Sequence, residues 1–194
     1  MSSVFQEGLA KAAGCSDAWV ITGGTKSGVM ELVGEALGAK STHNTDTRPP
    51  LIGIAPWRWL NETHRKELRA RGGDVKTLRR PSEDEEEKFL DPNHTHFIMV
   101  DNGDSRGGRT VHGEIQLRNE LERFCCLHLS VPLVCIVLQG GVGTFQTVVG
   151  ALQNHCQALF LADSGGCAGI VAEFIEPLLK LRLVDVAIEN GARR

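Results

Sequence analysis

The chain has 194 residues, 41% of them hydrophobic, and a formal net charge of −3. This apolar content suffices for one well-packed core, so we expect a single domain over residues 1–194 with its core at about 7–182. The acidic balance argues against nucleic-acid binding, which depends on Lys and Arg at the phosphates. The longest apolar run, Val131 to Leu138, is far shorter than the roughly 20 residues that span a membrane. Because the N-terminus also lacks a secretory signal pattern, we expect a cytoplasmic chain with no direct membrane insertion.

Cysteine and histidine positions give no pattern of a metal site. The six cysteines include no Cys-x-x-Cys pair, and several lie inside apolar runs, so we expect reduced thiols in the core. His94 and His96 would share one face of a strand, but no third ligand stands at a recognisable spacing. We therefore expect no metal ion and no resident cofactor.

Apolar segments alternate between strand-like and helix-like spacing. Strands are expected at Ala18–Ile21, Leu51–Ile54, Thr95–Val100, Leu133–Leu138 and Ala158–Leu161, and helices at Glu7–Ala13, Val29–Leu37, Asn61–Ala70, Ile115–Phe124, Val148–Leu152 and Ile170–Leu178. Continuous apolar strands that alternate with helices predict an α/β, Rossmann-like fold: a mostly parallel sheet of about five or more strands with helices on both faces. The stretch 72–93, with the acidic run at 82–88, predicts a solvated excursion; a flexible surface loop is favoured there over a site for cations or basic partners.

A glycine-rich turn, Thr22-Gly23-Gly24-Thr25-Lys26-Ser27-Gly28, follows the first expected strand and leads into a helix. Glycine lets the backbone turn sharply and approach a ligand, and the first N–H groups of the helix carry a partial positive charge. A phosphate is the anion that such a place suits best. The spacing matches neither the dinucleotide G-x-G-x-x-G motif nor the P-loop, and a tight turn without a ligand explains this one turn equally well.

Two further turns lie at the ends of expected strands. Gln139-Gly140-Gly141-Val142-Gly143-Thr144 follows the fourth strand, and Asp163-Ser164-Gly165-Gly166 follows the fifth. Because the carboxyl ends of parallel strands share one edge of a sheet, the three turns are expected to converge where ligands bind in such folds. Convergence favours a phosphate site over unoccupied turns.

Five stretches of the chain resemble, in the same order, the N-terminal homology region of melastatin-type TRP (TRPM) cation channels. They are Ala18–Thr25 with Gly28-Val29-Met30, Ile52–Trp57, Leu90–Asp101, Gly113–Arg118 with Leu121-Glu122, and Pro132–Thr144. The resemblance covers about residues 7–175 and implies a SLOG-type (LSDAT) fold, a Rossmann relative found in nucleotide-metabolite sensors and some nucleoside-monophosphate hydrolases.

The resemblance also implies a ligand. In some channels of this family the region binds ADP-ribose or a related nucleotide, and an arginine in the Leu-Arg segment contacts it; Arg118 stands at that place. The planar guanidinium can bind phosphate at two points. Alternatively, Arg118 pairs with Glu114 or Glu122 on its own helix.

A catalytic group of related enzymes is replaced in this chain. The cytokinin-activating phosphoribohydrolases are similar at Gly140–Thr144 but carry a glutamate three residues after the threonine, where this chain has Thr147. A threonine cannot replace that carboxylate, so binding without turnover is expected and no catalytic residue is assigned. The nearby acids Asp101, Asp104, Glu114 and Asp163 are expected to be caps or loop residues.

The leading hypothesis is a cytoplasmic, non-catalytic nucleotide-sensing domain of a TRPM-type channel or of a stand-alone relative, with phosphates across the first two glycine turns. Its expected partners are the nucleotide and other channel domains or subunits. The alternatives are a subunit-assembly module without a ligand and a nucleoside-monophosphate hydrolase. The short arginine-rich loop Gly103–Arg109 and the acidic stretch before Phe89 depart from the family pattern. The candidate ligand-binding residues are Thr22, Gly23, Gly24, Thr25, Lys26, Gly28, Arg118, Gly140, Gly141, Gly143, Thr144, Ser164, Gly165 and Gly166.

Overall fold

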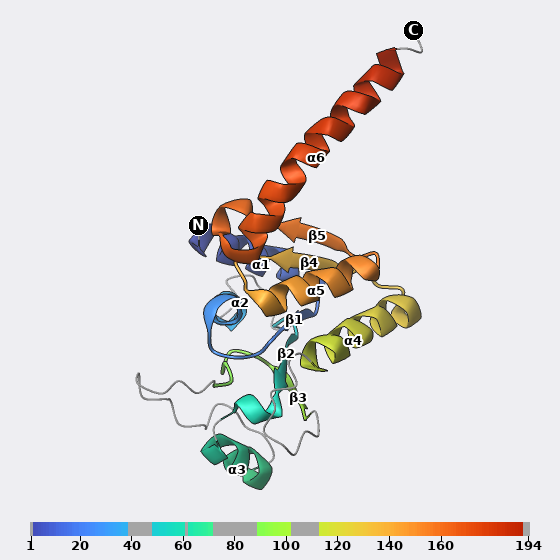
Figure 1. Cartoon of the computed structure of the whole chain (residues 1–194). Helices are drawn as coiled ribbons and strands as arrows, with labels where there is room; N and C mark the ends of the chain where they lie inside the picture. Colours follow the sequence, from blue (N-terminus) through green and yellow to red (C-terminus); the bar gives the residue numbers. More distant parts are fainter. Residues whose placement is uncertain (1, 39–47, 61, 72–88, 102–112, 192–194) are drawn as a thin grey trace. The chain divides into compact units, whose positions relative to one another are not determined.

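A computed structural model describes residues 2–38, 48–60, 62–71, 89–101 and 113–191 (Figure 1). In chain order the elements are α1 (Ser2–Ser16), β1 (Val20–Thr22), α2 (Gly28–Gly38), β2 (Leu51–Pro56), η1 (Trp57–Trp59), α3 (Glu62–Arg71), β3 (His96–Val100), α4 (Gly113–Leu129), β4 (Val134–Val137), α5 (Val142–Gln153), β5 (Gln157–Phe160), η3 (Ala162–Ser164) and α6 (Gly166–Gly191). The acidic run at 82–88, the arginine-rich loop Gly103–Arg109 and Asp104 lie outside the described residues.

The chain divides into two compact units, Met1–Arg118 and Asn119–Arg194, and the division falls inside α4. The expectation of a single domain over the whole chain stays a prediction.

All five expected strands are present, and every observed pairing is parallel. The first unit holds a sheet in the order β1-β2-β3, with Thr22 opposite Gly53 and Pro56 opposite Val100. The second unit holds the pair β4-β5. Parallel strands alternating with helices confirm the α/β, Rossmann-like fold class.

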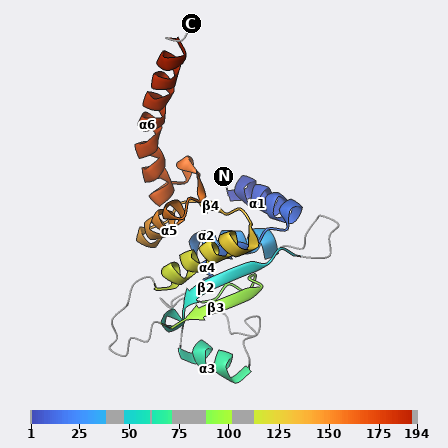
Figure 2. The ribbon, with the colours of Figure 1, turned by 90° about the vertical axis from the view of Figure 1, so that its right-hand side faces the viewer.

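Two core clusters of the first unit lie on one face of β2, and Ile54 on the opposite face is also buried, at 2% exposed. Leu51 packs with Val33 and Leu37 of α2 and with Ala13 of α1, so that these two helices lie together over the start of β2. Ala55, four residues after Leu51 and therefore on the same face of β2, packs in a second cluster with Leu60 and Leu90 that also includes Leu68 of α3. Figure 2 shows β2 and β3 side by side.

The core of the second unit forms between its strand pair and two helices. Val137 of β4 packs with Val148 of α5 and with Cys167 and Ala168 of α6. Val134 and Ile136 point to the opposite face of β4 and are 56% and 43% exposed, respectively. The short strands of this unit thus bury one face among the described residues.

Within the part of the chain that the structure describes, no helix combines the length and the apolar character that crossing a bilayer requires.

Candidate functional site

The conformation of the first glycine turn is fixed by hydrogen bonds within the turn and by one to Phe89. Thr22 Oγ1 accepts a hydrogen bond from the Gly24 N–H at 2.9 Å, Phe89 O accepts from the Lys26 N–H at 2.7 Å, and Thr25 O accepts from the Ser27 N–H at 2.8 Å. Gly24 and Thr25 are buried, whereas Lys26 and Gly28 are exposed. In this conformation the middle of the turn is closed, and its exposed part is the start of α2.

The start of α2 keeps the properties of an anion site. The first three N–H groups of any α-helix have no partner within the helix, and here they belong to Gly28, Val29 and Met30. Gly28 has a φ of +53°, and a side chain added there would meet open space. Lys26 Nζ lies 3.8 Å from Glu31 Oε1, with both side chains more than one-third exposed, so the pair is screened by solvent. The lysine is therefore able to exchange its partner.

A segment far along the chain pairs with this turn. Thr25 and Leu90 form an isolated antiparallel bridge, in which Lys26 donates to Phe89 O and the Asp91 N–H donates to Gly24 O at 2.9 Å. Leu90 is 5% and Asp91 0% exposed. The expectation of a solvated excursion over 72–93 is therefore wrong for these two residues, because they close the core beside the glycine turn.

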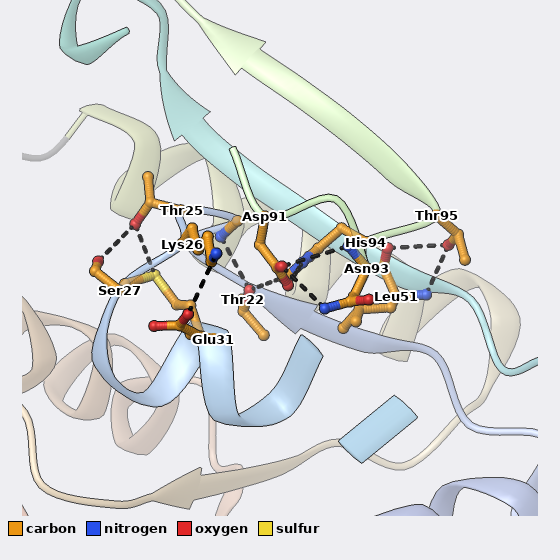
Figure 3. Close-up of polar contacts among 12 residues, drawn as sticks. Thr22, Thr25, Lys26, Ser27, Glu31, Leu51, Asp91, Asn93, His94 and Thr95 are labelled. Atoms are coloured by element: carbon orange, nitrogen blue, oxygen red, sulfur yellow. Dashed lines mark hydrogen bonds and ion pairs between the residues drawn. The ribbon is translucent and has the colours of Figure 1, made fainter. Parts of the chain in front are cut away.

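A buried polar network joins the same segment to the end of β1 (Figure 3). Thr22 Oγ1 lies 2.7 Å from His94 Nε2, and His94 Nδ1 lies 2.8 Å from Asp91 Oδ2. The other carboxylate oxygen accepts from the Asn93 side-chain amide at 3.2 Å. His94 precedes β3 and is buried, while His96 begins the strand and is exposed, so the two histidines do not form a pair.

Two glycines of this region are required by the fold itself. A Cβ on Gly24 would lie 2.7 Å from Gly53 Cα, and one on Gly53 would lie 2.6 Å from Gly24 Cα. The backbones of the turn and of β2 therefore touch. Gly24 also has a φ of +69°, which side-chain-bearing residues rarely adopt. The glycine at position 24 thus needs no ligand to explain it.

The second glycine turn leads into an open helix start. Gly141 is the N-cap of α5 and provides no side-chain hydrogen bond to the first turn of the helix. The N–H groups of Thr144 and Phe145 donate to Gly141 O, which leaves those of Val142 and Gly143 directed out of the helix end. Val142 is 74% exposed, and a side chain added at Gly141 would meet no atom within 4 Å. This helix start is accessible to an anion.

The third turn lies against the second, as the sequence predicts for neighbouring parallel strands. Gly140 O accepts from the Cys167 N–H at 2.9 Å, and Gln139 O accepts from the Ala168 N–H at 3.0 Å. Ser164 Oγ accepts from the Gln139 N–H at 2.8 Å. The first N–H groups of α6 are thus capped by the protein's own carbonyls, so the third turn supports the second one and does not form an anion site of its own.

A family defined by sequence and described as SLOG in TRPM matches residues 1–185. The chain belongs to this family. Its curated relatives include transient receptor potential cation channel subfamily M member 2 of Mus musculus at 35% identity, a member-like 2 protein of Nematostella vectensis at 33%, and the channel trpm of Drosophila melanogaster at 35%. Each match covers 88–89% of this chain but only 8–12% of the relative. The chain thus corresponds to a small part of those channels.

The structure also describes Arg118, Thr147 and two of the nearby acids of this SLOG-in-TRPM chain. Arg118 is half-buried on α4. Thr147 Oγ1 donates to Gly143 O at 3.1 Å, so its hydroxyl is engaged with its own helix. Asp101 lies 3.6 Å from Arg58, and Asp163 is exposed in η3. Among the described residues, no three His, Cys, Asp or Glu side chains gather as metal ligands would.

Two residues of the buried network were missed in the sequence. Asp91 and His94 lie in a stretch that matches the family, but neither was assigned a role. The available signal was the pair Gly34 and Gly38, which lie four residues apart on one face of α2. Small residues on one helix face allow another segment to approach closely, and Asp91 and His94 belong to the segment that does so.

Proposed function

We propose that this SLOG-in-TRPM domain senses a phosphorylated nucleotide such as ADP-ribose, without turnover, on the cytosolic side of a TRPM-type cation channel. Family membership and the TRPM channels among its relatives support the channel context. The chain covers only 8–12% of those relatives, and the proposal assigns it no part in ion conduction. The domain's proposed role is to bind the ligand.

The start of α5 is the observation that carries the proposal. Two backbone N–H groups, those of Val142 and Gly143, point out of a helix end whose N-cap offers them no oxygen. Such groups favour an anion because the helix dipole adds a partial positive charge. The start of α2 offers a similar set of donors beside Lys26, a cation with a solvent-screened partner.

The non-catalytic part of the proposal is supported by Thr147. This side chain has no carboxylate, and its hydroxyl donates to the backbone of α5. It is therefore unable to act as the acid or base that hydrolysis of a nucleoside monophosphate requires at this position. Incubation with AMP, followed by chromatography, should release no free base; release above the uncatalysed level would revive the hydrolase alternative.

A matched pair of substitutions at Gly141 tests the sensor. Gly141→Asp places a carboxylate where the ligand's phosphate is proposed to lie, so it should cap α5 and compete with the ligand. We expect the free energy of unfolding to rise by a few tenths of a kcal/mol and up to about 1 kcal/mol, while the affinity for ADP-ribose falls at least about tenfold, which corresponds to roughly 1.4 kcal/mol. Gly141→Ala adds no oxygen and should keep the affinity.

Isothermal titration with ADP-ribose, AMP and NAD provides the measurement. Heat from at least one nucleotide in the wild-type domain, lost in Gly141→Asp and kept in Gly141→Ala, supports the proposal. Absence of heat at millimolar ligand, from a protein shown to be folded by circular dichroism, would falsify it.

A stripe on α6 favours a second candidate function, subunit assembly. Ile170, Phe174 and Leu178 recur every four residues along this helix, and they are 60%, 73% and 53% exposed, respectively. Residues four apart share one helix face, and a contiguous exposed apolar face is typical of a docking surface. Phe174→Glu in the full-length channel should lower the fraction of assembled subunits in size-exclusion chromatography if assembly is the role. Unchanged assembly would count against it.

A further inference from the structure

The segment from Leu90 to Thr95 is fastened to both sides of the start of α2. On one side, Asp91 donates its N–H to Gly24 O, and His94 contacts the hydroxyl of Thr22. On the other side, the segment lies against α2 itself: a Cβ on Gly34 would be 2.7 Å from Asp91 Cγ. The turn before the helix and the second turn of the helix are thus held by the same carboxylate-bearing segment.

The same close approach repeats one helical turn later. A Cβ on Gly38 would be 2.7 Å from the Asn93 Cβ, and Asn93 in turn donates its side-chain amide to Asp91 Oδ1 at 3.2 Å. Because residues 34 and 38 lie on one face of the helix, these two glycines form a shallow strip in which the Asp91 and Asn93 side chains lie. The position of α2 relative to the turn is therefore set by side chains from another part of the chain.

With a neutral imidazole, one assignment of the protons satisfies every hydrogen bond of the network. Asp91 Oδ2 accepts from His94 Nδ1, and its Oδ1 accepts from Asn93, as an acceptor-only carboxylate does. His94 then has its proton at Nδ1 and a lone pair at Nε2, which accepts the Thr22 O–H at 2.7 Å. The Thr22 oxygen remains free to accept the Gly24 N–H at 2.9 Å. Each donor in this hydrogen-bond network then has one acceptor.

A hydroxyl, an imidazole and a carboxylate in this order also occur in hydrolases. Here the Thr22 oxygen already accepts the Gly24 N–H, and the His94 and Asp91 side chains are only 0% and 1% exposed. A substrate thus could not reach the imidazole, which a general base must do. The arrangement is suited to holding the turn.

We propose that Asp91 and His94 are positioning residues of the nucleotide site: through Thr22 and Gly24 they fix the turn that presents Lys26 and the first N–H groups of α2. This inference rests on the proposed function, because it assigns the start of α2 to the ligand. Neither residue touches the ligand. Their contribution is preorganisation, since donors fixed before binding lose less conformational freedom when the ligand arrives.

The first test removes individual bonds with little change of shape. Thr22→Val deletes the hydroxyl, so the Gly24 amide should exchange its hydrogen at least tenfold faster in deuterium exchange by NMR, and the affinity for ADP-ribose should fall severalfold. Thr22→Ser keeps the hydroxyl and should restore both values to near those of the wild type. Equal behaviour of the two variants would overturn the proposal.

The second test reverses the direction of hydrogen-bond donation between residue 91 and His94. Asp91→Asn can donate to His94 Nδ1, so the imidazole proton should move to Nε2, as the ring ¹⁵N chemical shifts of His94 report. ADP-ribose affinity should then fall severalfold, with the fold kept by circular dichroism. A proton already at Nε2 in the wild type, or an unchanged affinity in a folded Asp91→Asn variant, would contradict the inference.

The two proposals fail in distinguishable ways. If the wild-type domain binds no nucleotide, while Thr22→Val still deprotects the Gly24 amide and Thr22→Ser does not, the network holds the turn but the sensor function is lost, and with it the positioning role. If the wild type binds ADP-ribose but neither network variant weakens binding, the sensor stands and the positioning role falls.

Discussion

His94 Nδ1 lies 2.8 Å from Asp91 Oδ2, and both side chains are almost completely withdrawn from solvent. A buried group left without its partner costs roughly 1–3 kcal/mol, and more when it is charged. Asp91→Ala leaves His94 and Asn93 without an acceptor, so we expect the free energy of unfolding to fall by at least about 1–3 kcal/mol, as measured by urea denaturation.

Asp101→Ala is the matched control for this loss. Asp101 likewise has a side-chain partner, Arg58, but its own side chain is 54% exposed. An exposed pair contributes about 0–1 kcal/mol. If the two alanine variants lost equal stability, burial of the Asp91 contact would not be the source of its effect.

The contact between Gly24 and Gly53 leads to a second prediction. A Cβ at position 53 would lie 2.6 Å from Gly24 Cα and 2.9 Å from the Phe97 ring, and the backbone of the turn cannot move without breaking its bonds to the Phe89–Asp91 segment. Gly53→Ala should therefore destabilise the domain by about 1–3 kcal/mol, the usual cost of overpacking a core.

Gly8→Ala provides the opposite result within the same chain. Gly8 lies inside α1, where a Cβ meets nothing within 4 Å. Alanine lowers the cost of the helix by about 0.5–1 kcal/mol, so thermal unfolding should shift upward for Gly8→Ala and downward for Gly53→Ala. A Gly53→Ala variant as stable as the wild type would show that the backbones can separate freely.

The positions of the helices and strands could be predicted from the sequence because the patterns that indicate them involve residues close together in the chain. Short apolar runs located all five strands, although β1 begins at Val20, two residues later than expected, and Trp19 before it is 60% exposed. An apolar residue next to a strand carries the same local signal whether or not it pairs. Only the hydrogen bonds to β2, which begin at Val20, fix the boundary.

The closed state of the first glycine turn was not predictable from such signals. It depends on contacts between Thr22 and His94, which are 72 positions apart in the chain. Glycines that make room for a phosphate and glycines that make room for another backbone look the same in a sequence. The neighbouring turns at Gln139–Gly141 and Ser164–Gly166 were predictable as a pair, because parallel strands bring their ends to one edge.

Thiol reactivity should rank the cysteines by burial. Burial raises the pKa of the Cys167 thiol and, together with the neighbouring Cys126 and Glu122, that of Cys156, whereas Cys15 is exposed on α1. The thiolate is the nucleophile, so a raised pKa and poor access both slow alkylation. With iodoacetamide at neutral pH, mass spectrometry should find Cys15 modified first and Cys167 last. Faster modification of Cys167 would indicate that the α6 core opens readily.

The same thiols predict an alkaline loss of stability. The pKa of Cys167 in the folded state lies above its ordinary value of 9.0, so the unfolded chain releases this proton first as the pH rises. Stability from Cys167 is therefore full below about pH 9 and decreases above it. In denaturation series at pH 8 and pH 10, Cys167→Ala should show a smaller drop than the wild type. An equal drop would assign the pH dependence to other groups.

The junction of the second and third turns depends on Gly166, and a pair of alanine substitutions isolates the reason. Gly166 has a φ of +56°, and a Cβ there would lie 2.6 Å from Gly140 O; Gly28 has a φ of +53° but open space around it. Gly28→Ala should thus cost only the left-handed backbone, about 1–2 kcal/mol. Gly166→Ala should cost more, since it also pushes the Gly140 carbonyl away from the Cys167 N–H.

The same substitution should affect the ligand site. Gly140 directly precedes Gly141, the N-cap of α5, and its carbonyl caps α6, so Gly166→Ala should also weaken ADP-ribose binding at the start of α5. Urea denaturation and titration of both variants decide the matter: equal stability losses would show that the two turns do not support one another.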